Sequence, residues 1–132
     1  MRQRAIIFFA HGSRDPLWQA PMQAIAERAR QLDATAQVRL AYLELSAPAL
    51  PDVVAELAAA GVADFTVMPL FLGMGQHARR DLPALLAGLR AQYPGLTFTQ
   101  LPPLGEDPRL IELAAGMAVF PDLPAPLKPA SA

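Results

Sequence analysis

The chain has 132 residues, of which 53% are hydrophobic, so it is long enough for one domain with a substantial core and too apolar for a disordered protein. Its 11 Lys and Arg residues nearly balance 12 Asp and Glu residues, which excludes the broad basic surface that attracts nucleic acid. The absence of cysteine excludes disulfides, thiolate metal sites, iron–sulfur ligation and a cysteine nucleophile.

The N-terminal segment, MRQRAIIFFAHGSRD, contains an apolar run that is too short for a signal peptide. No stretch of the sequence approaches the roughly 20 apolar residues of a membrane helix. We therefore expect a soluble cytoplasmic protein that binds neither nucleic acid nor membranes.

The first half of the chain predicts two strands, each followed by a helix. Residues 5–10 (AIIFFA) form a continuous apolar run, which is typical of a strand covered on both faces. The loop HGSRDP follows, and its Asp-Pro pair suits the start of a helix that continues to about Gln31. Residues 37–45 (QVRLAYLEL) predict a second strand, and the helix after it ends at Gly61.

The second half repeats this alternation. Residues 64–72 (DFTVMPLFL) predict a third strand, and the third helix is predicted to start at Asp81. Residues 96–101 predict a short fourth strand, and the Asp-Pro pair at 107–108 again suits a helix start. Four alternations with short connections favour a three-layer α/β fold, in which helices cover both faces of a parallel sheet.

This domain is predicted to occupy residues 1–118. The segment 119–132 is rich in proline and lacks helical periodicity. We expect it to be a mobile tail.

The 2 histidines of the chain are predicted to lie close together. In a doubly wound sheet, ligands bind beyond the carboxyl ends of the strands, where the strand order reverses. For the flavodoxin-like order 2-1-3-4, the reversal lies between strands 1 and 3. His11 follows strand 1 and His77 follows strand 3, so both are expected in one crevice, with Glu44 at the end of strand 2 beside them.

These side chains suit an open metal site. Two imidazoles with one carboxylate cannot form a closed structural zinc site, which needs four protein ligands. Imidazole does bind Co²⁺, Ni²⁺, Fe²⁺ and Zn²⁺, and it accepts a proton near neutral pH. Arg14, Arg79 and Arg80 lie within three residues of the histidines, and guanidinium groups bind carboxylates or phosphates. Each of these residues is also compatible with an ordinary solvated loop.

Three separated segments resemble one family. HGSRDP after the first strand, YLELSAP at the second and VMPLFLGMGQHARRDLP at the third are similar to the small single-domain sirohydrochlorin cobaltochelatases, within the class II tetrapyrrole chelatases. The resemblance covers residues from about 4 to 118. It implies a flavodoxin-like chelatase fold, a homodimer and no organic cofactor. It also implies that the chain inserts a divalent metal, Co²⁺ by default with Fe²⁺ or Ni²⁺ as alternatives, into sirohydrochlorin during cobalamin or sirohaem biosynthesis.

The resemblance implies a role for each candidate residue. His11 and His77 would hold the metal or accept the pyrrole protons, and Glu44 would orient a histidine or assist the metal. The residues expected to bind the anionic macrocycle are Ser13, Arg14, Gly75, Arg79 and Arg80.

Other functions fit part of the pattern. A phosphohistidine enzyme would carry arginine directly before the histidine, where this chain has Ala10. A second alternative is a protein that carries a flavin or a nucleotide. The nucleotide version is disfavoured because neither G-x-x-x-x-G-K-[ST] nor G-x-G-x-x-G occurs in the sequence. A non-catalytic metal carrier that uses the same two histidines is the main alternative.

Overall fold

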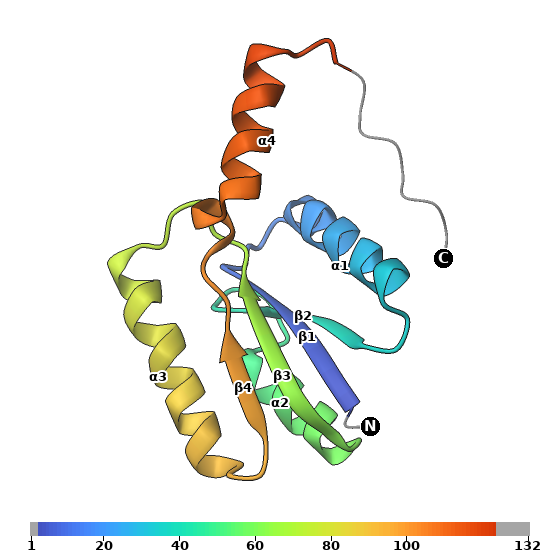
Figure 1. The fold of residues 1–132 in the computed structure, drawn as a ribbon. Helices are drawn as coiled ribbons and strands as arrows, with labels where there is room; N and C mark the ends of the chain where they lie inside the picture. The colour runs from blue at the N-terminus through green and yellow to red at the C-terminus, as the bar shows by residue number, and fades with distance from the viewer. Residues whose placement is uncertain (1–2, 124–132) are drawn as a thin grey trace.

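Parallel strands and helices alternate along residues 3–123, which the computed structural model describes (Figure 1). The strands are β1 (Gln3–Ala10), β2 (Gln37–Tyr42), β3 (Val62–Pro69) and β4 (Thr97–Gln100). The α-helices are α1 (Ala20–Leu32), α2 (Leu50–Ala59), α3 (Gln76–Gln92) and α4 (Pro108–Val119), and the short 3₁₀ helices are η1 (Pro16–Gln19) and η2 (Leu104–Glu106).

The sheet has the order β2-β1-β3-β4 with every pair parallel, which confirms the predicted topology. The order reverses between β1 and β3, which are neighbours at the centre. Phe9 of β1 lies opposite Pro69 of β3, so these two strands end side by side. Their carboxyl ends therefore form the edge where this class of fold binds ligands.

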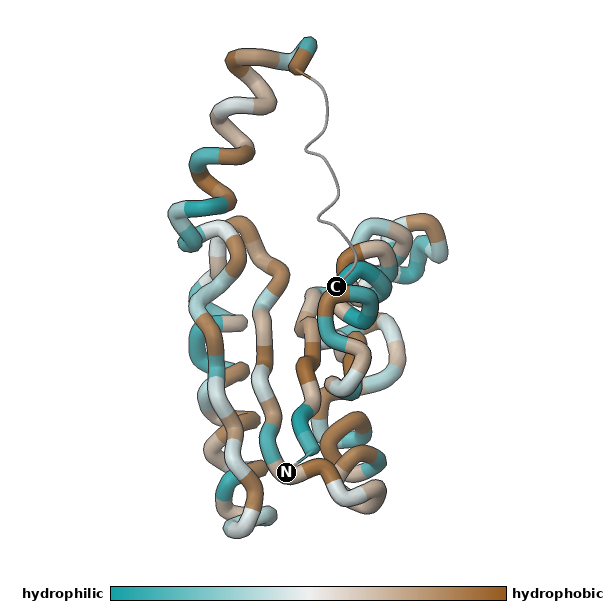
Figure 2. Tube along the Cα trace, turned by 45° about the vertical axis from the view of Figure 1, so that its right-hand side comes forward, coloured by the Kyte–Doolittle hydropathy of each residue, from teal (hydrophilic) through white to brown (hydrophobic). Residues whose placement is uncertain are grey.

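The helices cover the two faces of the sheet unequally. α2 and α3 pack on one face, and α1 packs on β1 and β2 on the other, so the predicted three layers are present. α4 instead leaves the carboxyl end of the sheet and stands apart from the layers (Figure 2). Across residues 3–123, none of the helices is long and apolar enough to cross a membrane.

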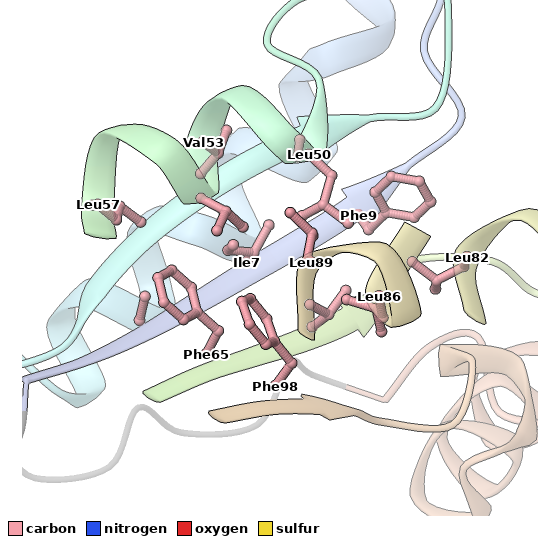
Figure 3. Close-up of a cluster of buried hydrophobic side chains, with 14 of the residues drawn as sticks. Ile7, Phe9, Leu50, Val53, Leu57, Phe65, Leu82, Leu86, Leu89 and Phe98 are labelled. Atoms are coloured by element: carbon pink, nitrogen blue, oxygen red, sulfur yellow. The ribbon is translucent and has the colours of Figure 1, made fainter. Parts of the chain in front are cut away.

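The larger core lies between the sheet and the helices α2 and α3 (Figure 3). Ile7 and Phe9 of β1 are fully buried there, and Phe65 stacks on Phe98 with ring centroids 5.1 Å apart. The helices contribute Leu50, Val53, Leu57, Leu82, Leu86 and Leu89. Burial of each large apolar side chain contributes roughly 1.5–3 kcal/mol. Because Phe9 belongs to this core, the end of β1 that precedes His11 is held rigidly.

Two strands end earlier than the sequence predicts. β2 ends at Tyr42 rather than at Leu45, because its partner β1 ends opposite it at Ala10. The chain then turns, and Leu45 adopts a positive φ of 62°. β3 likewise ends at Pro69 rather than at residue 72, since its last partner in β1 is Phe9 and its pairing with β4 stops at Val67.

Helix α3 begins at Gln76, so the prediction that Asp81 starts this helix was wrong. Gly75 is the residue before the first turn, and its backbone is extended. The segment QHARRD contains no helix breaker, and the Asp81 carboxylate contacts a side chain rather than capping a backbone N–H group. His77, Arg79 and Arg80 are therefore held in a helix and not in a loop.

The start of α4 agrees with its sequence signal. Asp107 accepts a hydrogen bond from the Arg109 backbone N–H at 2.8 Å, and Pro108 occupies the first turn. Hydrogen bonds from the Arg109 side chain and backbone lower the pKa of Asp107 to about 2. The helix continues to Val119, the first residue of the predicted tail 119–132. Residues 124–132 of that tail lie outside the described part of the chain.

Candidate active site

His11 lies at the carboxyl end of β1, where its ring packs on a buried aromatic residue. The ring centroids of His11 and Phe71 are 4.3 Å apart, and the rings meet edge to face at 65°. Phe71 is only 3% exposed and follows β3, so this contact bridges the ends of the two central strands. The other side of His11 is open to solvent. The imidazole is therefore oriented by the core and accessible to a ligand.

The backbone of Glu44 lies directly against the loop that follows His11. The Glu44 N–H group donates a hydrogen bond to the His11 carbonyl at 2.9 Å. Gly12 crosses this segment at φ 106°, and a Cβ atom at Gly12 would lie 1.6 Å from the Glu44 carbonyl oxygen. Only glycine permits both this backbone angle and this approach. The structure thus brings Glu44 next to His11, as the sequence predicts, and leaves the Glu44 side chain exposed.

Ser13 fixes the shape of the same loop. Its backbone N–H donates to Ser46 Oγ at 3.0 Å, and Ser46 Oγ donates to the Ser13 carbonyl at 2.8 Å. Its hydroxyl oxygen accepts a hydrogen bond from the Asp15 N–H group at 3.1 Å. Ser13 is thereby tied to the β2–α2 connection, while the neighbouring Arg14 is exposed.

His77 lies on the first turn of α3 and is paired with a carboxylate that sequence reasoning did not assign to the site. His77 Nε2 is 2.8 Å from Asp81 Oδ2, one helical turn away. The His77 side chain is 83% exposed, and that of Asp81 is 40% exposed. When Nε2 donates to Asp81, the lone pair of a neutral imidazole is on Nδ1. The spacing of His77 and Asp81 at i and i+4 is the sequence signal for this pair, but Asp81 also fits the pattern of a helix start, which is the role predicted for it.

Three arginines surround this edge. Arg14 follows β1, and Arg79 and Arg80 lie on α3, with the Arg79 N–H bonded to the Gly75 carbonyl at 3.0 Å. All three side chains are exposed. Within residues 3–123, no acidic side chain forms an ion pair with any of them. They are therefore free to bind an anionic ligand.

Apolar side chains also lie in the loops at this edge, which the sequence did not single out. Leu17 follows β1, Leu45 follows β2 and Leu72 follows β3, and their exposed fractions are 80%, 56% and 78%. Exposed leucines have no value for the fold of one chain, but they suit contact with a large apolar ring or a second protein. We call Leu17, Leu45 and Leu72 the leucine rim.

The described residues do not form a complete metal-binding site. Within residues 3–123, no group of three or more His, Asp and Glu side chains is placed to hold an ion. An open site with few protein ligands is what a metal needs if it is to pass through the site and leave.

A separate groove of about 610 Å³ runs between α2 and α3. It is lined by Leu85, Gly88 and Leu89 among others, and it reaches Asp81 at one end.

Comparisons with known proteins agree with this architecture. The CbiX family model matches residues 5–118 of the chain. A sirohydrochlorin cobaltochelatase from Methanothermobacter thermautotrophicus is 32% identical over an alignment of 125 residues, which covers 82% of this chain and 85% of that protein.

Two solved structures are also similar. A CbiX protein from Marinobacter aquaeolei VT8 has a TM-score of 0.76 and 37% identity, with 90% of this chain and 96% of that chain covered. The sirohydrochlorin chelatase SirB from Bacillus subtilis subspecies spizizenii, solved in complex with cobalt, has a TM-score of 0.74 and 24% identity. The match covers 89% of this chain but 51% of SirB, so this chain spans about half of SirB and shares its fold. The match to residues 5–118, together with relatives of similar length, shows that the chain belongs to the CbiX family.

Proposed function

We propose that this chain inserts a divalent metal ion, Co²⁺ in particular, into sirohydrochlorin. The observation that carries the proposal is that, in a chain of the CbiX family, both histidines lie at the carboxyl edge of the two central strands. Co²⁺ is chosen because the relative from Methanothermobacter thermautotrophicus is a cobaltochelatase. Fe²⁺ and Ni²⁺ have similar ligand preferences and are the alternative substrates. Which metal is used decides between the cobalamin and sirohaem pathways.

The chemistry of insertion fits two exposed imidazoles. Two pyrrole N–H protons must leave the macrocycle while the hydrated ion exchanges water for the pyrrole nitrogens. We assign contact with the incoming ion to His11 and His77. Once the ion has passed to the pyrrole nitrogens, Nδ1 of His77 would be free to accept one pyrrole proton, with the Asp81 carboxylate beside the ring, and solvent water would take the second proton. Glu44, next to His11 in the structure, would orient that histidine or assist the release of water.

The macrocycle would bind across the same edge. Its carboxylates would pair with Arg14, Arg79 and Arg80, and an exposed guanidinium group can bind a carboxylate through two hydrogen bonds. Its flat face would lie on the leucine rim. Ser13 and Gly75 would contact it through the loops before and after the two histidines.

The protein would act as a homodimer. One domain of this size presents a single edge to a wide, flat macrocycle, and the leucine rim leaves that edge partly apolar. A second copy would enclose the macrocycle from the opposite side and exclude water from the apolar surface.

Turnover separates this proposal from a metal carrier. With sirohydrochlorin and Co²⁺ in excess over protein under anaerobic conditions, we expect the absorbance of the metallated product to rise at a rate proportional to protein concentration. A carrier would bind Co²⁺ in the absence of the macrocycle, yet would leave the insertion rate at that of free Co²⁺. Repeating the assay with Fe²⁺ and Ni²⁺ on the same preparation identifies the preferred metal.

Replacement of Asp81 by Asn is expected to lower turnover by roughly 10–100-fold, the range found when the carboxylate partner of a functional histidine is removed. The amide keeps the shape of the carboxylate but cannot stabilise a positive imidazolium. Asp81→Glu, which restores the charge, should recover much of the lost rate, and this recovery distinguishes a positioning role from a purely structural one. Glu56→Gln, an exposed change on α2, is the matched control. Equal activity of wild type and Asp81→Asn would remove Asp81 from the mechanism.

A further inference from the structure

The segment that follows β3 is held from two sides. The Leu70 N–H group donates to the Phe9 carbonyl at 2.8 Å, which extends the contact with β1 by one residue. The Phe71 carbonyl accepts a hydrogen bond from the Gly105 N–H group of η2 at 2.9 Å. In Figure 1, the connection from β4 to α4 passes this end of β3 before α4 begins. Residues 70–72 therefore lie between the end of β1 and η2, like a short added strand.

Gly105 is the residue that lets η2 approach this segment. A Cβ atom at Gly105 would lie 1.6 Å from the Leu72 carbonyl oxygen and 2.4 Å from the Leu72 carbonyl carbon. Both obstacles are backbone atoms, which cannot move aside as the end of a long side chain can. Any larger residue at this position must therefore separate η2 from residues 71–72, and the hydrogen bond to the Phe71 carbonyl is lost with that separation.

The Phe71 ring connects this segment to His11. Phe71 is 3% exposed, and its ring meets the Phe9 ring edge to face with centroids 6.1 Å apart. It also meets the His11 imidazole, with centroids 4.3 Å apart. In the described part of the chain, the His11 imidazole has no hydrogen-bond partner, whereas His77 is bonded to Asp81. The orientation of the His11 ring thus depends on Phe71 rather than on a polar group.

We infer that Phe71 and Gly105 are positioning residues for the proposed reaction: η2 holds Phe71 in place through Gly105, and the Phe71 ring sets the orientation of the His11 imidazole. Phe71 is buried and Gly105 has no side chain, so both act through His11 rather than by touching the ion or the macrocycle. Orientation of a reacting group matters because a misplacement of about 1 Å can reduce a rate by about 100-fold. The effect on the rate rests on the proposed metal insertion, whereas the orientation of His11 does not.

Nuclear magnetic resonance tests the orientation directly, because the chain has only 2 histidines. Their imidazole signals are told apart with His77→Ala, at one fixed pH and without metal. In wild type, we expect a nuclear Overhauser effect between the rings of His11 and Phe71, and a ring-current shift of the His11 ring protons. In Gly105→Ala both should weaken, while the His77 signals stay in place. An absent Overhauser effect in wild type, or unchanged His11 signals in Gly105→Ala, would overturn the inference.

Gly116→Ala is the matched control for Gly105→Ala. Gly116 lies in α4, and no atom lies within 4 Å of its missing Cβ, so the His11 signals should not change in this variant. Both variants are compared at a temperature at which urea unfolding shows that they are folded.

Phe71→Leu acts at the other end of the same chain of contacts. Leucine keeps the position apolar but removes the ring, so the ring-current shift of the His11 protons should disappear. Phe98→Leu is its matched control, since it removes another buried ring, 5% exposed, which stacks on Phe65 instead. The His11 signals should stay unchanged in Phe98→Leu. An equal change in both variants would reflect a general loosening of the core and would overturn the assignment to Phe71.

Insertion rates then connect the orientation of His11 to the reaction. For Gly105→Ala and Phe71→Leu, we expect kcat for Co²⁺ insertion to fall roughly 10–100-fold, with little change in the KM for sirohydrochlorin. Gly116→Ala and Phe98→Leu should retain the wild-type kcat. An unchanged kcat in a variant whose His11 signals have moved would overturn the positioning role. A wild type that shows the contact between His11 and Phe71 but does not insert Co²⁺ would overturn the proposed function, and would leave the orientation of His11 by Phe71 in place.

Discussion

Replacing His77 with alanine is expected to reduce the rate of Co²⁺ insertion by about 10²–10⁴-fold, the range that a positioned acid or base contributes. The side chain is 83% exposed and packs on nothing that the fold needs, so the free energy of unfolding should change by less than about 0.5 kcal/mol. Initial rates in the anaerobic absorbance assay and urea unfolding of the same preparation measure the two effects separately. Loss of activity with an unchanged unfolding midpoint is the expected signature of a functional residue.

His11→Ala should cause a comparable loss of rate. It should also lower stability slightly, because the imidazole packs edge to face on Phe71 with ring centroids 4.3 Å apart. Gln76→Ala is the matched control, since Gln76 is exposed, precedes His77 and lies on the same turn of α3. Gln76→Ala should retain the wild-type rate. A histidine variant that also retains most of that rate would show that the replaced histidine is not a reacting group.

The strand order could be predicted because the sequence leaves few possible sheet topologies. The apolar runs at residues 5–10 and 64–72 are typical of strands covered on both faces, and short connections between alternating elements favour parallel pairing. The ends of the elements could not be predicted as well. β2 stops at Tyr42 because β1 stops opposite it, and this length depends on a partner 32 positions earlier in the chain rather than on the local sequence.

The site was predictable to the extent that topology determines it. His11 and Glu44 follow neighbouring strands, so they had to meet, and their backbones are joined by a hydrogen bond of 2.9 Å. Asp81 was missed because an aspartate before a leucine-rich stretch is a common helix cap, whereas its carboxylate bonds His77. The leucine rim was missed because exposed leucines carry no pattern in the sequence.

Gly12 allows the loop after His11 to lie against the backbone of Glu44. A residue with a side chain at this position would push His11 and Glu44 apart. Its φ of 106° lies in a region that residues with a Cβ atom rarely adopt, and a Cβ atom would lie 1.6 Å from the Glu44 carbonyl oxygen. The obstacle is backbone, which cannot swing aside as a long side chain can. The loop that begins at His11 would have to move away from the β2–α2 connection, breaking the hydrogen bonds between Ser13 and Ser46.

Gly12→Ala is therefore expected to destabilise the protein by about 2–4 kcal/mol, of which roughly 1–3 kcal/mol is backbone strain. Insertion should also fall at temperatures where the variant is still folded, because Glu44 and His11 would no longer be held together. Gly88→Ala is the matched control: Gly88 lies inside α3 with no atom within 4 Å of its missing Cβ, so alanine should stabilise the helix by up to about 1 kcal/mol. Urea unfolding measures the change in the free energy of unfolding, which should be negative for Gly12→Ala and positive for Gly88→Ala. A Gly12→Ala protein as stable and as active as wild type would mean that the loop has room to relax and that the close approach of Gly12 to Glu44 does not organise the site.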